Sequence, residues 1–489
     1  MDQRQRPTVV VAGAGASGVL LANALARPGV AFDVILVDPR PGRGVAFGGG
    51  DAHHLLNTRV GNMSLDAVSP DCFLDWLNTY HPRADGWDAG DFAPRKLYGD
   101  YLERRLADLE NRTPGLGTTR VVRARAEAAE HAEDGWSVRL STGERLVADV
   151  LVLATGLARP RPLLFLGRDA IEAHVLDDPW DDAALRTTPG GEGVLLVGSG
   201  LTAMDVASAL WRRDPGLRVL AVSRHGMLPR VHASPAPSAP VLSPPYPTTA
   251  RELYAKLRAS ADFVEGDQSL RHGVFLGLRE IAAGLWSALP HEERAMFLRH
   301  FRPYWEVERH RIPPAQADVI QKAIKAGRLE VVRGRVAEAK ALPDGSGARV
   351  ALITQNGPRA VAVSRMINCT GPEADPFRSR NPLLLDLLAQ GAAGADPLGL
   401  GLHVDDECGV LNAAGAPTRG LYALGALTQG RFFEITGLAE IRAQAERLAA
   451  QITVEAVIRE LSGEHLQAKP SPSPAAPWRT SGNASPDQP

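Results

Sequence analysis

Short apolar runs and helix-spaced segments alternate along this chain, and the clearest example lies near its start. Residues 8–12 (TVVVA) form an apolar, β-branched run that ends at a cluster of glycines. Residues 17–27 carry apolar side chains at nearly helical spacing, and residues 32–38 (FDVILVD) form a second buried-type run. This pattern predicts a strand, a helix and a strand within about thirty residues, which is the unit of a parallel sheet.

The same pattern returns over residues 194–222, where GVLLVG, LTAMDVASALWRR and LRVLAVS follow one another. These two units are the only internal repeat that we find, and they indicate an α/β fold. For the rest of the chain we expect, in order, short strands at 120–150, an irregular Pro- and Ser-rich loop at 226–250, two or three amphipathic helices at 251–302, a helix and then strands at 316–353, a strand at 363–371, and a strand, a loop and a long helix at 420–449.

Composition excludes several classes of protein. Of the 489 residues, 44% are hydrophobic and 22% are charged, and the net charge of −2 gives no general attraction to nucleic acid or to anionic membranes. We find no signal-peptide pattern and no apolar stretch of membrane-spanning length, so we expect a cytoplasmic protein without a membrane segment. Cys72, Cys369 and Cys408 are far apart, which argues against a dithiol relay or a disulfide framework. We expect no metal site.

The glycines after the first strand have the spacing of a dinucleotide-binding fingerprint, in the stretch Gly13-Ala14-Gly15-Ala16-Ser17-Gly18. In this motif the first glycine allows a tight turn, the second lets the backbone approach a pyrophosphate, and the third permits close helix–strand packing. The helix that follows offers free N–H groups to the phosphates. Asp38 ends the second strand, where a carboxylate accepts hydrogen bonds from an unphosphorylated ribose. The strand, the helix and the acid together predict an FAD site.

The second fingerprint, Gly198-Ser199-Gly200-Leu201-Thr202-Ala203, differs from the first at one informative place. Asp38 lies twenty-five positions after Gly13, and the same interval from Gly198 ends at Ser223, which Arg224 follows. A carboxylate would repel a ribose 2′-phosphate, whereas a hydroxyl and a guanidinium bind one. The second unit therefore predicts a nicotinamide cofactor site that favours NADPH over NADH. The alternative for Arg224 is a solvated surface arginine.

With these residues in place, the chain resembles the flavoproteins with two dinucleotide-binding domains, among them the N-hydroxylating and Baeyer–Villiger-type monooxygenases. In those proteins a strand ending in Ala-Thr-Gly links the two domains, and Ala154-Thr155-Gly156 matches it. Asn368-Cys369-Thr370-Gly371 repeats that pattern on the return of the chain. The resemblance also implies that Leu421-Tyr422-Ala423-Leu424-Gly425 brings a glycine to FAD, although Ala426 stands where an Asp often follows. The Baeyer–Villiger signature itself is absent, because the intervals to His174 and Trp180 are too long.

More closely, residues 8–455 resemble a bacterial family of FAD/NAD(P)-binding proteins, some of them described as FAD-dependent urate hydroxylases. The resemblance implies the cofactors more firmly than the reaction. The matching stretches are Gly42-Arg43-Gly44-Val45-Ala46-Phe47, His54-Leu55-Leu56-Asn57, Phe92-x-Pro94-Arg95-x-x-Tyr98-Gly99-x-Tyr101 and Gly430-Arg431-Phe432-Phe433-Glu434-Ile435-Thr436-Gly437.

Three segments are candidates for the residues that face the flavin ring. The first holds His53, His54 and Asn57 with Asn62-Met63, although histidines in a loop are more often structural than catalytic. The second is Thr436-Gly437, because a helix that begins there would place its positive end near developing negative charge. The third is Arg302-Pro303-Tyr304-Trp305 with Arg309-His310-Arg311, which is alternatively a solvated helix face. No catalytic acid or base is identified.

The predicted fold is therefore α/β, with two Rossmann-like three-layer domains, the NAD(P) domain inserted in the FAD domain, and a helical insertion. We expect a first part of the FAD domain at 1–160, an NAD(P) domain at 161–365 with the helical insertion at about 226–312, a second part of the FAD domain at 366–460, and a disordered tail at 466–489.

Three hypotheses on function follow. The first is an NADPH-dependent FAD monooxygenase that uses O2 on a small molecule such as an amine or a purine-like compound. The second is a flavin-dependent reductase or dehydrogenase that uses the same cofactors without oxygenation. The third is a non-catalytic FAD-binding sensor or assembly partner, which would leave the second fingerprint without a purpose. The sequence identifies neither the substrate nor the oligomeric state.

Overall fold

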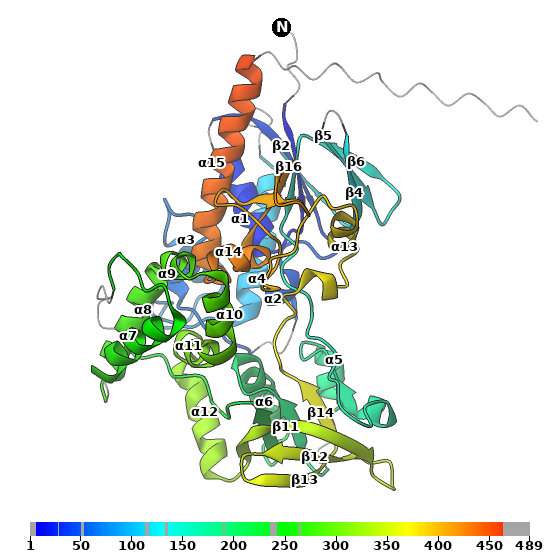
Figure 1. Ribbon diagram of the computed structural model, residues 1–489, viewed down its shortest axis with the longest axis vertical. Helices are drawn as coiled ribbons and strands as arrows, with labels where there is room; N and C mark the ends of the chain where they lie inside the picture. The colour runs from blue at the N-terminus through cyan, green and yellow to red at the C-terminus, as the bar shows by residue number, and fades with distance from the viewer. Residues whose placement is uncertain are drawn as a thin grey trace, which may run out of the picture.

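Most strands of the chain belong to two largely parallel sheets, one above the other in Figure 1, and three more form a small antiparallel sheet. The computed structural model describes residues 6–462 except 28, 50–52, 113–116, 133–134, 189–190, 235–241 and 264–265. The expected tail at 466–489 and the centre of the Pro- and Ser-rich loop thus lie outside the described residues. The fold is α/β, as the sequence predicts.

The first sheet has the strand order β15-β16-β7-β1-β2-β3. Its strands are parallel from β16 to β3, and only β15 is antiparallel to its neighbour. Valine and leucine dominate the central strands, which are buried on both faces, as in other parallel sheets covered by helices. The strand bounds are β1 Thr8–Ala12, β2 Phe32–Val37, β3 Gly117–Val122, β7 Val150–Leu153, β15 Gly409–Leu411 and β16 Pro417–Ala423.

Helices cover one face of this sheet, and a small antiparallel sheet covers the other. Side chains of α1 (Ala16–Leu25), α4 (Arg95–Glu110) and α15 (Leu438–Ser462) share one hydrophobic core with strand residues such as Val9 and Val152. On the opposite face, a second core joins the sheet to α13 and the three-stranded sheet β4-β5-β6. The bounds are β4 Ala126–Ala132, β5 Gly135–Leu140, β6 Arg145–Ala148 and α13 Pro382–Ala389.

The second sheet has the order β13-β12-β11-β10-β9-β14-β8. It is parallel from β11 to β8, and a long hairpin adds β12 and β13 at one edge. Helices α6 (Leu201–Arg213) and α12 (Pro314–Lys325) pack on one face. The strand bounds are β8 Val175–Leu176, β9 Val194–Val197, β10 Val219–Ser223, β11 Leu329–Ala341, β12 Ala348–Thr354, β13 Gly357–Val363 and β14 Arg365–Asn368.

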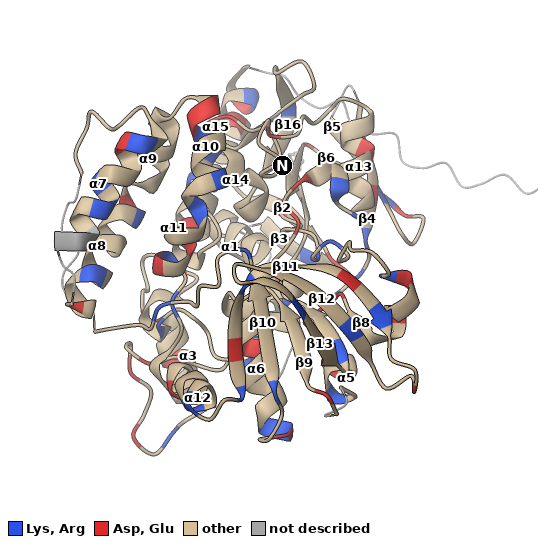
Figure 2. Cartoon of the chain, turned by 60° about the horizontal axis from the view of Figure 1, so that its bottom comes forward, with Lys and Arg blue, Asp and Glu red and all other residues tan. Residues whose placement is uncertain are grey.

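Between β10 and α12, the residues that the structure describes form a unit of five helices, and Figure 2 shows it at one side of the molecule. The expectation of two or three helices at 251–302 is wrong, because four occur there and a fifth follows. The amphipathic pattern continues across short breaks that separate the helices and that it does not reveal. Ile281 leaves helical geometry between α8 and α9, and Pro290 precedes α10. The bounds are α7 Ala250–Phe263, α8 Gln268–Glu280, α9 Ala282–Ala288, α10 His291–His300 and α11 Arg302–Arg309.

The aromatic core of this helical unit anchors it to the first domain, by which we mean the first sheet and the elements packed on it; the second domain is likewise built on the second sheet. Trp286 of α9 stacks on Phe433, with ring centroids 4.6 Å apart, and its indole N–H donates to the Gly430 carbonyl. Among the described residues, no helix is long and apolar enough to cross a membrane. The remaining helices are α2 Gly44–Gly48, α3 Cys72–Tyr80, α5 Asp182–Arg186 and α14 Gln429–Phe432.

Candidate functional site

The first fingerprint forms a turn in which side chains would not fit. Gly13 has a φ of +111°, and a Cβ added there would lie 2.6 Å from the carbonyl carbon of Ala154, which directly follows β7. Gly15 precedes α1 and faces Gly44, with 3.5 Å between its ideal Cβ and the Gly44 Cα. No described side chain caps the start of α1, so its first N–H groups remain available to phosphate oxygens.

Asp38 stands at the end of β2 and braces this turn. Its Oδ2 accepts a hydrogen bond from the Ala14 N–H at 2.9 Å, and its Oδ1 accepts one from the Arg40 N–H at 2.7 Å. A carboxylate oxygen accepts more than one hydrogen bond. Asp38 can therefore hold the loop and still accept from a ribose hydroxyl.

Two more predicted residues converge on the start of α1 from distant parts of the sequence. Thr155 follows β7, and its buried Oγ1 has no hydrogen-bond partner among the described residues. Gly425 follows β16 with a φ of +71°, and a Cβ there would crowd Ser17 in the first turn of α1. A buried hydroxyl without a partner costs free energy unless a ligand satisfies it. The residues present therefore fit FAD.

The second fingerprint repeats this geometry around β9. Gly198 has a φ of +122°, and a Cβ there would lie 2.7 Å from the carbonyl carbon of Cys369 on the neighbouring segment. Gly200 precedes α6 without a capping side chain among the described residues. Gly371 lies two residues beyond Cys369, as Gly156 lies two residues beyond Ala154. The two Thr-Gly motifs thus hold corresponding positions against the two glycine turns.

The acid of the first site is replaced by a hydroxyl network in the second. Ser199 Oγ donates to the Met227 carbonyl at 2.6 Å and lies 2.8 Å from Ser223 Oγ, which accepts from the Gly226 N–H. Because the Ser199 proton points to Met227, the Ser223 hydroxyl donates to Ser199. Ser223 thus takes the bracing place that Asp38 holds in the first site, without its negative charge.

Three basic side chains gather where β10 ends. Arg224 is exposed, and Arg333 of β11 lies opposite Ser223 in the parallel register. Burial first, and then the charges of Arg224 and Arg333, lower the pKa of His225 between them. Neither arginine has an ion-pair partner among the residues that the structure describes. Arg333 carried no signal in the sequence, because only the pairing of β10 with β11 brings it to this place.

The first candidate flavin-facing segment lies at the contact between the domains. His54 is 2% exposed, and its Nε2 donates to the Asp205 carbonyl of α6 at 3.1 Å. The Asn57 carbonyl accepts from His232 Nε2 at 2.9 Å, in the segment that follows β10. Both residues of the first domain therefore contact the second domain.

An ion pair between a buried aspartate and a partly buried arginine strengthens the same contact. Arg95 Nη2 lies 3.2 Å from Asp205 Oδ2, while Gln316 Nε2 donates to Asp205 Oδ1 at 2.8 Å. Arg95 also lies over the ring of Trp180 at 5.2 Å. The family resemblance points to the stretch that contains Arg95, but its partner on α6 carries no sequence signal.

Replacing Arg95 with methionine is expected to lower the free energy of unfolding by about 3 kcal/mol, because Asp205 then loses the cation of a buried pair. Urea titration followed by circular dichroism measures this. Arg104→Met, on the outer face of the same helix α4 in a largely exposed pair with Asp108, is the matched control and should cost less than about 1 kcal/mol. Equal losses in the two variants would contradict the role given to Arg95.

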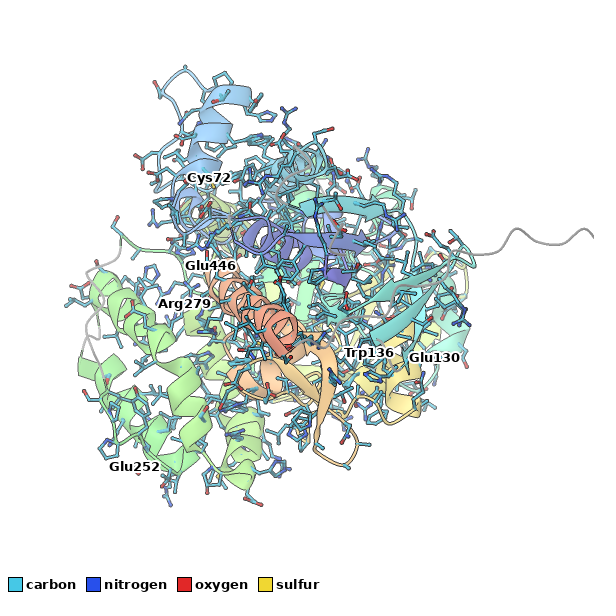
Figure 3. The ribbon with its side chains drawn as sticks, turned by 90° about the horizontal axis from the view of Figure 1, so that it is seen from above. Cys72, Glu130, Trp136, Glu252, Arg279 and Glu446 are labelled. Atoms are coloured by element: carbon cyan, nitrogen blue, oxygen red, sulfur yellow. The ribbon has the colours of Figure 1, made fainter. Side chains whose placement is uncertain are left out.

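The second candidate segment lies beside a charged cluster at the start of α15. Thr436 is exposed and Gly437 is half-buried. Arg279 of α8 pairs with Glu440, and Arg309 of α11 lies 2.9 Å from Glu434. Figure 3 shows Arg279 where the helical unit meets α15. The helix start is thus held against the helical unit by ion pairs.

The third candidate segment is partly buried. Trp305 and Arg311 are buried, and Arg311 donates to the Val231 carbonyl and to Glu308. Arg302 pairs with Glu306 one helical turn away. The run is therefore a packed part of the helical unit, with only Tyr304 largely exposed on it.

Comparisons with known proteins agree with this geometry. Residues 10–158 match a protein family described as FAD-NAD(P)-binding. A search of curated protein sequences finds no match. The chain has the fold of flavoproteins with two dinucleotide-binding domains, as its similarity to solved structures shows.

Three of those structures show the extent of the similarity. The ornithine N-hydroxylase of Kutzneria sp. 744, solved with reduced FAD, NADP+ and L-ornithine, superimposes with a TM-score of 0.60 at 17% identity, over 92% of this chain and 99% of that one. The FAD-bound cadaverine monooxygenase of Erwinia amylovora gives 0.63 at 15%, over 96% and 99%. The bacillithiol disulfide reductase of Staphylococcus aureus gives 0.55 at 10%, over 93% and 99%.

Proposed function

We propose that the protein is an NADPH-dependent FAD monooxygenase that acts on a small molecule. In such a reaction one oxygen atom of O2 enters the substrate, the other leaves as water, and NADPH supplies two electrons. The main observation behind the proposal is that two glycine turns share the same geometry. Asp38 braces the first turn, and Ser223 braces the second beside Arg224 and Arg333. The similar ornithine and cadaverine enzymes support it.

In this proposal the chain's own residues bind and position the two cofactors. The N–H groups at the start of α1 and α6 bind pyrophosphates, and Thr155 donates its buried hydroxyl to FAD. Bound FAD supplies hydride acceptance from the nicotinamide and reaction with O2. The hydrogen bonds of His54 and Asn57 hold the two domains, and with them the two cofactor sites, in a fixed relation.

The reductase alternative is not favoured in its dithiol form. Cys369, the cysteine nearest the second glycine turn, is buried, and burial raises the pKa of its thiol well above the ordinary value. Burial also raises the pKa of Cys408 to about 11. The thiolate is the reactive form of cysteine, so neither residue suits a thiol relay.

Reconstitution with FAD followed by oxygen-electrode measurement tests the proposal. The protein should bind FAD, oxidise NADPH, and consume O2 faster when the substrate is present. Failure to retain any FAD would contradict the proposal. Flavin reduction by NADPH with turnover of an artificial acceptor, but with no oxygenated product from any compound, would favour the reductase.

Arg224→Gln and Arg333→Gln are each expected to raise the KM for NADPH about 10- to 100-fold, because each removes a charge-assisted contact to the 2′-phosphate worth about 1.5–3 kcal/mol. The KM for NADH, which lacks that phosphate, should change less than about twofold. Arg335→Gln, an exposed arginine two residues farther along β11, is the control. Equal increases in the KM for NADH and for NADPH would show that the arginines do not bind the 2′-phosphate.

A further inference from the structure

A cavity of about 210 Å³ lies within the helical unit. Helices α7, α8, α10 and α11 line it, together with Met227 and Arg230 from the segment that follows β10, and it is partly open to solvent. A water molecule takes about 30 Å³ in the liquid, so the space corresponds to roughly seven waters. Its size therefore suits a small molecule.

Aromatic side chains form most of the cavity wall. Tyr254 and Phe301 stack with centroids 4.4 Å apart, and Phe275 and Trp305 meet edge to face at 6.1 Å. Flat apolar walls of this kind favour a planar ligand that packs against ring faces and edges. The aromatic lining residues are Tyr254, Phe275, Phe297, Phe301, Tyr304 and Trp305.

The charged part of the wall is rich in arginine. Glu308 is the single carboxylate among the described lining residues, and it is 6% exposed. Arg271 Nη2 donates to it at 2.6 Å, and Arg230 Nε and Arg311 Nη2 each lie 3.2 Å from it. One carboxylate therefore faces three guanidinium groups, which leaves a positive field at this end of the cavity.

Burial and the neighbouring arginines lower the pKa values of two histidines beside the cavity. Burial, followed by the charge of nearby Arg311, lowers the pKa of His272 to about 4. Burial likewise lowers the pKa of His232 to about 4, and Arg59 and Arg311 contribute to the shift. Both imidazoles are therefore neutral near pH 7. The positive charge of this region resides in its arginines, which stay protonated.

The cavity is connected to the second candidate flavin-facing segment through α11. Trp305 lines the cavity, and its indole N–H donates to Glu434 Oε1 at 2.6 Å. Glu434 lies two residues before Thr436 in the sequence. A ligand in the cavity would therefore be separated from that segment by the side chains of a single helix.

We propose that this cavity binds the substrate, and that the substrate is a small aromatic anion whose ring packs among the aromatic side chains and whose charge meets the arginines around Glu308. The assignment as substrate rests on the proposed monooxygenase function, whereas the binding of the anion does not. The amine substrates named for the similar ornithine and cadaverine enzymes carry ammonium groups, which this field would repel.

Calorimetric titration of the FAD-loaded protein with benzoate, benzyl alcohol and benzylamine tests the charge requirement, because the three probes share a ring and differ in charge. Benzoate should bind, and the other two should bind at least about tenfold more weakly. Benzylamine binding as tightly as benzoate, or no binding of any of the three, would overturn the inference.

Two variants locate the binding. Arg230→Gln should weaken benzoate binding about tenfold, while Arg299→Gln, an exposed arginine of α10 outside the cavity lining, should leave it unchanged. Glu308→Gln removes the competing carboxylate and should tighten benzoate binding severalfold. Unchanged benzoate binding in Arg230→Gln would contradict the proposed site. This test is independent of whether the Glu308→Gln variant folds.

Oxygen uptake separates this inference from the proposed function. Benzoate binding without NADPH-dependent O2 uptake by any FAD-loaded sample would leave the anion site standing and refute the monooxygenase. NADPH-dependent O2 uptake in a protein that binds benzylamine in preference to benzoate would leave the proposed function standing and refute the anionic substrate.

Discussion

A Gly13→Ala variant is expected to lose FAD binding, with an increase in Kd of at least about 100-fold, or about 2.8 kcal/mol. The reason is steric. At a φ of +111° an alanine Cβ would lie 2.6 Å from the Ala154 carbonyl carbon, so the turn or β7 must move. Either movement displaces the N–H groups of α1 and the Thr155 hydroxyl. Fluorescence titration of the apoprotein with FAD measures the loss.

The control for this variant is Gly143→Ala, in the turn between β5 and β6. Gly143 also has a positive φ, +86°, but its ideal Cβ meets nothing within 4 Å. Gly143→Ala introduces the strain of an alanine at positive φ but no steric clash, so FAD binding should remain normal. Thermal unfolding of both variants separates misfolding from cofactor loss. Normal FAD affinity in folded Gly13→Ala protein would contradict the placement of FAD at the first glycine turn.

A Gly198→Ala variant is expected to retain FAD and to be reduced by NADPH at least about 100-fold more slowly at a fixed, subsaturating NADPH concentration. Its Cβ would lie 2.7 Å from the Cys369 carbonyl carbon, which distorts the turn before α6. The first domain is not touched by this change. Stopped-flow spectra of the flavin measure the rate, and reduction by dithionite, which needs no second site, should be unaffected.

Gly357→Ala is the matched control in the second domain. Gly357 has a φ of +102° in the hairpin between β12 and β13, and its ideal Cβ meets nothing within 4 Å. Reduction by NADPH should proceed in this variant at nearly the normal rate. A Gly198→Ala protein that lost FAD together with NADPH reduction would contradict the assignment of the two cofactors to separate glycine turns.

The sequence predicts the two strand–helix–strand units well because their signals are local. The glycines at 13, 15 and 18, the buried strands around them and Asp38 all lie within one short stretch, and each has a steric or hydrogen-bonding reason to be there. The late strand at 417–423 and the long helix that begins at Leu438 also follow from local apolar patterns.

Residues brought together by long-range pairing are not predictable in this way. Arg333 reaches the end of β10 only because β11 pairs with β10, and Asp205 meets Arg95 only because the two domains pack. Glu308 gains its three arginines from separate parts of the helical unit and its flanking segments. The breaks among helices α7–α11 depend on packing as well as on propensity, and this is why the apolar pattern alone predicts too few helices.

Anaerobic reduction by NADPH and by NADH, followed by mixing with O2, tests the central claim that the first glycine turn holds FAD and the second holds NADPH. We predict that NADPH bleaches the visible absorbance of the bound flavin, that NADH does so at least about tenfold less efficiently, and that O2 restores the absorbance. A protein that binds FAD but is reduced by neither nucleotide, or that is reduced more efficiently by NADH than by NADPH, would contradict this claim.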